Sequence, residues 1–119
     1  MPRIWTLSIF FFLFAFKVSS QLAPSFTSDT QIGCSPLVVN FTNTSQNATN
    51  YSWDFGNGIQ SSLTNPSTTY TTPGFYTVKL IAQNATDTDS IIQVNYIQVL
   101  DLPTATFSIT SISNCFSDN

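Results

Sequence analysis

The side chains that could carry chemistry in this chain are few, and every acidic one is an aspartate. The 119 residues include six acids, three bases and no histidine or glutamate. Without histidine the chain cannot build a Ser-His-Asp or Cys-His nucleophile, or a zinc site that uses histidine. Catalysis by paired carboxylates would depend on aspartates scattered over turns. We therefore expect a segment that is not an enzyme.

Asp54 and Asn57 are the candidates for binding a metal ion. Asp54 precedes Gly56-Asn57-Gly58, whose glycines supply the positive φ angles of a tight turn. Its carboxylate can accept amide hydrogens of that turn, or it can ligate Ca²⁺ together with the oxygen of Asn57. Calcium normally takes six to eight oxygens, and few carboxylates converge here. The turn role is the expectation and calcium the alternative. No other cofactor is expected, and Asp87 and Asp89 are interpreted as solvated turn residues.

Alternating side chains predict the strands that would position these residues. Tyr51, Trp53 and Phe55 alternate with Ser52 and Asp54, and Tyr76, Val78, Leu80 and Ala82 alternate in the same way along 76–82. Leu37, Val39 and Phe41 are the expected inward face of 37–41. No window after the first twenty residues shows a helical period. The pattern predicts an all-β protein, an immunoglobulin-like antiparallel β-sandwich of about seven strands. Its expected strands are 26–28, 37–41, 51–55, 59–63, 68–70, 75–84 and 90–100.

The aromatic residues divide into expected core and expected surface positions. Trp53 and Tyr76 lie on the alternating apolar faces, so we expect Trp53 at the centre of the core, with Tyr76 packed near it and its hydroxyl at a strand corner. The alternative is that they stack on sugars. Phe75 and Tyr96, out of phase or near a sheet end, are the candidate surface-binding aromatics.

The same residues resemble the PKD (polycystic kidney disease) domain family, bacterial secreted or cell-surface type. The resemblance covers roughly 24–100 and depends on an ordered combination of a tryptophan strand, a glycine turn and two later motifs. The matching structural residues are Tyr51, Trp53, Asp54, Phe55, Gly56, Gly58, Asn65, Pro66, Tyr70, Pro73, Gly74, Tyr76 and Val78. Asn57 stands where the family has a second aspartate. Some relatives bind calcium near this turn, and the missing charge weakens any such site here.

The first twenty residues predict a secretory signal peptide. Arg3 is followed by the apolar run 4–16 and by Val18-Ser19-Ser20, with the cut expected after Ser20. The run is shorter than the roughly 20 residues of a membrane span, so no span is expected after its removal. The expected PKD-like domain is then 21–102.

Residues 103–119 predict the start of a second, truncated repeat. Phe26 and Cys34 recur as Phe107 and Cys115, 81 residues later. Asp101-Leu102-Pro103 would be the linker, and the chain would be the N-terminal fragment of a longer protein. The alternative is that Phe107 and Ile109 form an extra edge strand on the first domain.

The two cysteines are expected to lie about one domain length apart if the repeat is real. An internal Cys34–Cys115 disulfide is then not expected, because bridged Cα atoms lie within about 7 Å. Many bacterial relatives carry a second cysteine in the loop that here reads 85–89. Since that partner is missing, the resemblance implies a buried and free Cys34.

The charge of the mature chain limits which partners it can bind. After signal removal one base, Lys79, and six acids remain, which excludes a basic patch for nucleic acid. Five Asn-x-Ser/Thr sequons, at residues 40, 43, 47, 50 and 84, matter only in a glycosylating host.

The resemblance implies a non-catalytic, secreted or cell-surface module. It would contact an extracellular protein or polysaccharide, or act as a spacer for further domains of the same chain. The alternative is an accessory domain of a secreted hydrolase that degrades polysaccharide or protein.

Overall fold

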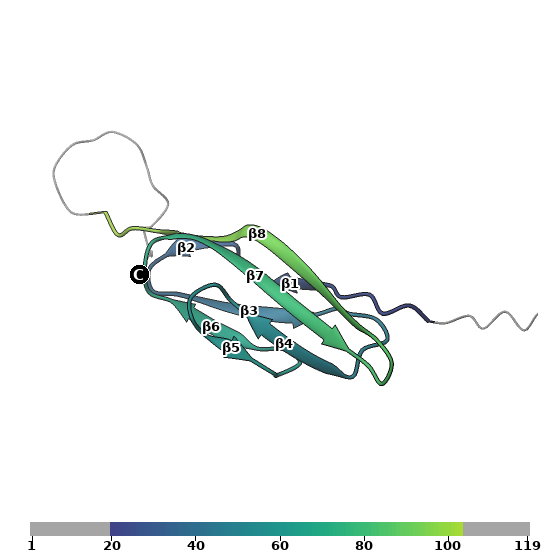
Figure 1. Cartoon of the computed structure of the whole chain (residues 1–119). Helices are drawn as coiled ribbons and strands as arrows, with labels where there is room; N and C mark the ends of the chain where they lie inside the picture. Colours follow the sequence, from purple (N-terminus) through teal and green to yellow (C-terminus); the bar gives the residue numbers. More distant parts are fainter. Residues whose placement is uncertain (1–19, 104–119) are drawn as a thin grey trace, which may run out of the picture.

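The computed structural model describes residues 20–103, which form two facing β-sheets without a helix (Figure 1). The first sheet has the order β1-β3-β6 and the second β2-β8-β7-β4-β5. The strands are β1 (Phe26–Ser28), β2 (Ile32–Cys34), β3 (Leu37–Asn43), β4 (Asn50–Asp54), β5 (Gln60–Ser61), β6 (Ser67–Tyr70), β7 (Gly74–Gln83) and β8 (Thr88–Leu100). The expected all-β, immunoglobulin-like sandwich is therefore confirmed.

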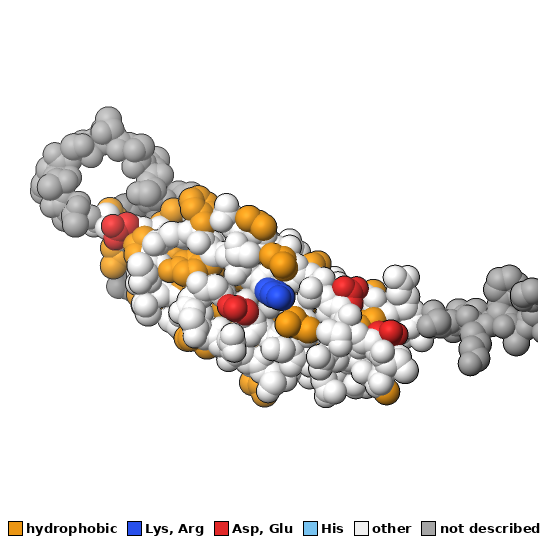
Figure 2. All heavy atoms as spheres, viewed as in Figure 1, with side chains coloured by type: hydrophobic (Ala, Val, Ile, Leu, Met, Phe, Trp, Pro, Cys, Tyr) orange, Lys and Arg blue, Asp and Glu red, His pale blue; other side chains and the backbone are white. Residues whose placement is uncertain are grey.

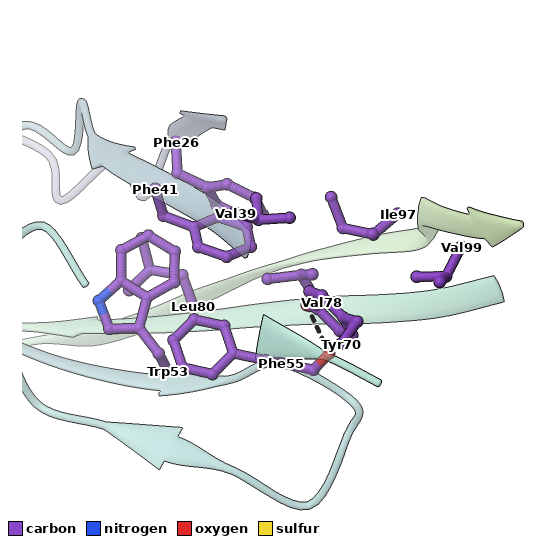
Figure 3. Packing of buried hydrophobic residues seen from close by; sticks show 10 residues of the cluster. All are labelled: Phe26, Val39, Phe41, Trp53, Phe55, Tyr70, Val78, Leu80, Ile97 and Val99. Atoms are coloured by element: carbon purple, nitrogen blue, oxygen red, sulfur yellow. Dashed lines mark hydrogen bonds between the residues drawn. The ribbon is translucent and has the colours of Figure 1, made fainter. Parts of the chain in front are cut away.

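The core lies between the two sheets and follows the alternation of the sequence (Figure 3). On β7, Val78, Leu80 and Ala82 are fully buried, and on β3, Val39 and Phe41 are buried beneath them. The buried hydrophobic cluster is Phe26, Val39, Phe41, Trp53, Phe55, Tyr70, Val78, Leu80, Ile97 and Val99.

Two strands differ most from the expectation, while β3 and β8 are each two residues longer than expected. β2 was not predicted, and it pairs with β8 in parallel, so the second sheet is not wholly antiparallel. It has three residues, Ile32 to Cys34, too few to show a period. β5 is shorter than the expected 59–63, because Ile59 and Leu63 are exposed and only Gln60 and Ser61 pair with β4.

Cys34 corrects another expectation, that of a buried and free thiol. It is half-buried and disulfide-bonded. It lies on the edge strand β2 opposite Leu100, where the chain leaves the domain, and not in the core. The chain's other cysteine, Cys115, lies outside the described residues.

The proposed signal peptide and the proposed second repeat also fall almost wholly outside the described residues, so both stay predictions. Within 20–103, no helix is long and apolar enough to cross a membrane. The described chain begins at one end of the sandwich and leaves at the other, where β8 ends (Figure 1).

Candidate functional site

Trp53 lies at the centre of the core. Its side chain is 1 % exposed, and its indole Nε1–H donates a 2.9 Å hydrogen bond to the carbonyl of Leu63. The ring of Phe26 meets it edge-on at 5.2 Å, and the ring of Phe55 stacks on it at 6.0 Å (Figure 3). The only polar atom of the side chain thus has a partner inside the protein, and no face of the ring is open to a sugar.

Asp54 and Asn57 both serve the turn that follows β4. Asp54 Oδ1 accepts the Gly56 N–H at 2.9 Å, and Asn57 Oδ1 accepts the Ile59 N–H at 3.1 Å. Asn57 Nδ2 donates to Thr68 Oγ1 and to the Thr69 carbonyl. The amide of Asn57 therefore joins the turn to β6, and it stands in this bonding role where the family has an aspartate.

Gly56 is required by the close approach of β7. It has φ +76°, and a Cβ on it would lie 2.6 Å from the carbonyl oxygen of Thr77. Gly58 also has positive φ, +85°, but a Cβ there would meet no atom within 4 Å. The two glycines of the turn are needed for different reasons: Gly56 for space and backbone, Gly58 for backbone alone.

The Asn65-Pro66 and Tyr70 motif joins the two sheets. Asn65 Oδ1 accepts the Asn43 N–H at 2.9 Å, and the Pro66 carbonyl accepts the Phe41 N–H at 2.8 Å. The Tyr70 hydroxyl donates to the Phe55 carbonyl at 3.0 Å, the dashed line of Figure 3. These contacts hold β6 beside β3 and fix the end of β4, so the motif serves the fold.

Tyr76 lies elsewhere than expected. Its ring packs against that of Tyr70, with centroids 4.5 Å apart, and not near Trp53. Its hydroxyl does lie at the corner before β7, where it donates to the Thr72 carbonyl at 2.6 Å. The reason is the position of Tyr76 along β7. Tyr76 lies near the start of the strand, whereas Trp53 pairs with Leu80, four residues further on.

The two candidate surface aromatics, Phe75 and Tyr96, differ in how far their rings are exposed. Phe75 is 61 % exposed on the outer face of β7. Tyr96 is half-buried: its ring meets Phe26 edge-on at 5.3 Å, and its hydroxyl is 3.3 Å from Ser28 Oγ in a hydrogen bond. Tyr96 therefore has much of its ring and its hydroxyl engaged within the domain. Phe75 keeps the exposure that a binding role needs.

An open hollow beside the glycine turn was not anticipated from the sequence. It is lined by Gly56, Asn57, Ile59, Thr69, Thr71, Thr72 and Tyr76. Hydroxyls, one amide and an aromatic edge are chemistry for hydrogen bonding to a polar ligand, and the run of threonines around Tyr70 was the available signal. The Asn57 amide and the Tyr76 hydroxyl are already bonded within the protein.

Burial raises the pKa of the Tyr70 phenol above its ordinary value of 10.0, with the nearby Tyr76 and Asp54 adding to the shift. The folded state therefore keeps this proton at a pH where the unfolded chain releases it. The stability that this group contributes is complete below about pH 10 and falls as the pH rises further.

We expect Tyr70→Phe to reduce the fall in the free energy of unfolding between pH 8 and 10.5. At pH 8 the variant should lose about 1 kcal/mol, because the Phe55 carbonyl loses its donor. Urea titrations of both proteins measure this, and parallel losses in the two would refute the assignment.

Calcium should have little effect on this domain. Within residues 20–103 no three carboxylates or cysteines converge as a metal site. A site of millimolar affinity would add only about 1 kcal/mol at several millimolar calcium. Melting temperatures in several millimolar CaCl₂ and in excess chelator should agree closely. A rise of ten degrees or so that disappears in Asp54→Asn would make Asp54 a metal ligand instead.

Comparison with known proteins identifies the family of this chain. The sandwich and its glycine turn define an immunoglobulin-like module, and the family model described as "PKD domain" matches residues 23–99. The chain belongs to the PKD domain family. A search of curated proteins gave no match.

Solved structures of PKD domains are similar to this chain in sequence or in fold. The PKD1 domain of the Vibrio cholerae metalloprotease PrtV is 32 % identical with a TM-score of 0.57, covering 66 % of this chain and 95 % of that one. The PKD1 domain of Vibrio anguillarum Epp is 31 % identical with a TM-score of 0.55 and the same coverages. The PKD domain of the human receptor SorCS2, at 21 % identity and a TM-score of 0.54 over 70 % of this chain and 75 % of that one, shares the fold.

Proposed function

We propose that this domain is a non-catalytic extracellular module that separates and presents other domains of a secreted or cell-surface protein. The observation that carries the proposal is the path of the chain, which enters at one end of the sandwich and leaves at the other (Figure 1). Each such module adds its whole length to the reach of the protein. β8 alone has 13 residues, and at about 3.3 Å per residue it spans about 40 Å.

Stiffness supports the same role. β7 and β8 form a long hairpin that pairs along most of its length, and the sandwich beneath it is closed by an aromatic core. At the exit, Leu102-Pro103 restricts the backbone of the linker. A contact role, with an extracellular protein or a polysaccharide, is compatible with this geometry because the outer faces stay open.

The spacer role is tested with two copies of residues 21–103 joined directly, studied by small-angle X-ray scattering at low concentration. We expect a maximum dimension of about 80 Å, twice that of one copy. A tandem that folds back on itself, with a dimension near that of one copy, would contradict the proposal.

The second candidate is an accessory domain of a secreted hydrolase. It is favoured by one observation, the similarity to a domain of the metalloprotease PrtV. The secreted polypeptide, purified from its source and mapped by mass spectrometry, distinguishes the two. Further 80-residue repeats in the same chain support the presenting role, and a catalytic domain supports the accessory role.

Secretion makes a separate prediction. The apolar run 4–16 followed by Val18-Ser19-Ser20 should be removed on export. N-terminal sequencing of the secreted protein should begin near Gln21. Recovery of Met1 in an integral membrane fraction would overturn the signal peptide.

A further inference from the structure

The outer face of the five-stranded sheet carries a stripe of exposed apolar side chains. Ile32 and Ile92 are each 55 % exposed, Phe75 61 % and Val94 72 %. Figure 2 shows hydrophobic groups spread over β7 and β8 around the single basic side chain of this view, which is Lys79. We call Ile32, Phe75, Ile92, Val94 and Lys79 the outer stripe.

Strand register places the members of the outer stripe on one face of the sheet, with Gln98 between Ile32 and Phe75. Lys79 lies opposite Ile92, and Gln98 lies opposite both Phe75 and Ile32. Phe75 and Lys79 point to the same side of β7, four residues apart, which is about 13 Å. Val94 follows Ile92 by two residues on β8 and is the most exposed member.

The chemistry of the outer stripe favours a protein partner over a polysaccharide. Its members are mostly branched aliphatic side chains, which pack against other apolar side chains. Sugar rings stack on aromatic faces, and this stripe has one ring only. A large exposed apolar surface on a soluble domain marks an interaction site.

We propose that the outer stripe is a homotypic docking surface, on which two copies of this domain pair face to face with their strands antiparallel. A twofold axis near Thr77, midway between Phe75 and Lys79 on β7, places each Lys79 over the partner's Phe75. The ring face attracts the ammonium group, so the stripe is complementary to itself. The same axis brings Val94 of β8 close to the partner's Val94 and places Ile92 over the partner's Gln98.

The charges of the face suit this arrangement. Asp54 lies opposite Lys79 on the same outer face, so the acid and the base within the face balance. The exposed acids Asp87 and Asp89 lie at the β7–β8 turn and Asp101 lies beyond the other end of β8, so antiparallel pairing keeps the two β7–β8 turns apart. The five strands of this sheet hold 33 residues, which at about 3.3 Å by 4.8 Å each give a face of about 500 Å². Each partner in a stable interface of ordinary size contributes roughly 800 Å², so the expected dimer is a weak one.

The test is sedimentation equilibrium of the mature chain between about 10 μM and 1 mM, with non-reducing gels to identify any disulfide-linked species. We expect a reversible, non-covalent dimer. Phe75→Ser and Val94→Lys should each weaken it at least tenfold, and Lys79→Gln should weaken it several-fold. Val38→Ser is the matched control: Val38 is 56 % exposed on β3, in the other sheet, and should not change the dissociation constant.

The proposal deepens the contact role given above. Because linked copies could pair within one tandem, the tandem used for scattering carries Val94→Lys in both copies, so that its dimension tests the spacer geometry alone. A wild-type chain that stays monomeric to 1 mM overturns it. So does a dimer that survives Val94→Lys, or one lost equally in Val38→Ser. Polysaccharide binding that is lost in Phe75→Ser without any dimer would assign the stripe to a sugar instead. Circular dichroism melts of each variant, unchanged from wild type, show that a loss of pairing is not a loss of fold.

Discussion

Trp53→Ala should unfold the domain. Trp53 is 1 % exposed and contacts the rings of Phe26, Phe41 and Phe55. Replacing a buried aromatic by alanine costs about 3–5 kcal/mol, and a domain of this size has a total stability of about 5–15 kcal/mol. The variant also leaves the Leu63 carbonyl without its donor. We expect most or all of the folded signal to be lost at 37 °C in a circular dichroism melt.

The matched control for this variant is Phe75→Ala. It also removes an aromatic ring from the five-stranded sheet, but from the outer face, where Phe75 is 61 % exposed. Its melting temperature should stay within a few degrees of wild type. If Trp53→Ala kept the wild-type midpoint and lost binding to a glycan, the ring would be a ligand residue and its place in the core would be wrong.

Gly56→Ala should be the most damaging single-methyl change in the glycine turn. Its Cβ would lie 2.6 Å from the Thr77 carbonyl oxygen, closer than such contacts occur, and that oxygen belongs to the backbone and cannot rotate away. Either the turn or β7 must move, which we expect to cost about 3 kcal/mol or more, steric clash and positive φ combined.

Gly58→Ala separates the two causes. It shares the positive φ but meets no atom within 4 Å, so it should cost only about 1 kcal/mol. Urea unfolding of the two variants gives the difference directly. Equal losses of unfolding free energy would mean that the positive φ angle alone requires glycine at both positions, and that the close approach of β7 to Gly56 does not affect stability.

Local alternation predicted much of this fold because each strand buries one face. Val78, Leu80 and Ala82 follow the period of β7, and Trp53 and Phe55 that of β4 and its end. Such patterns need several residues. β2, with three, was missed for that reason, and its parallel partner on β8 is 66 residues away in sequence.

The candidate site was predicted less completely, because bulges and long-range contacts leave no local signal. The register between β7 and β8 shifts between Tyr76 and Val78, and Asn95 has φ +50°. This irregularity directs the Tyr96 ring towards Phe26, although alternation suggested a surface position. The bonds of Asn57 to Thr68 and Thr69 on β6 are likewise set by the sandwich and not by the turn alone.

The central claim is that the residues of the family signature stabilise the fold, and that the function depends on the shape and outer faces of the module. Hydrogen exchange of the Trp53 indole proton tests it most directly, since Trp53 is the only tryptophan after residue 20. The account predicts that this proton exchanges only through global unfolding, as slowly as the slowest backbone amides of β7, and that its NMR resonance does not move when oligosaccharides are added. Fast exchange, or a resonance that shifts with added ligand while the amides of β7 stay protected, would contradict it.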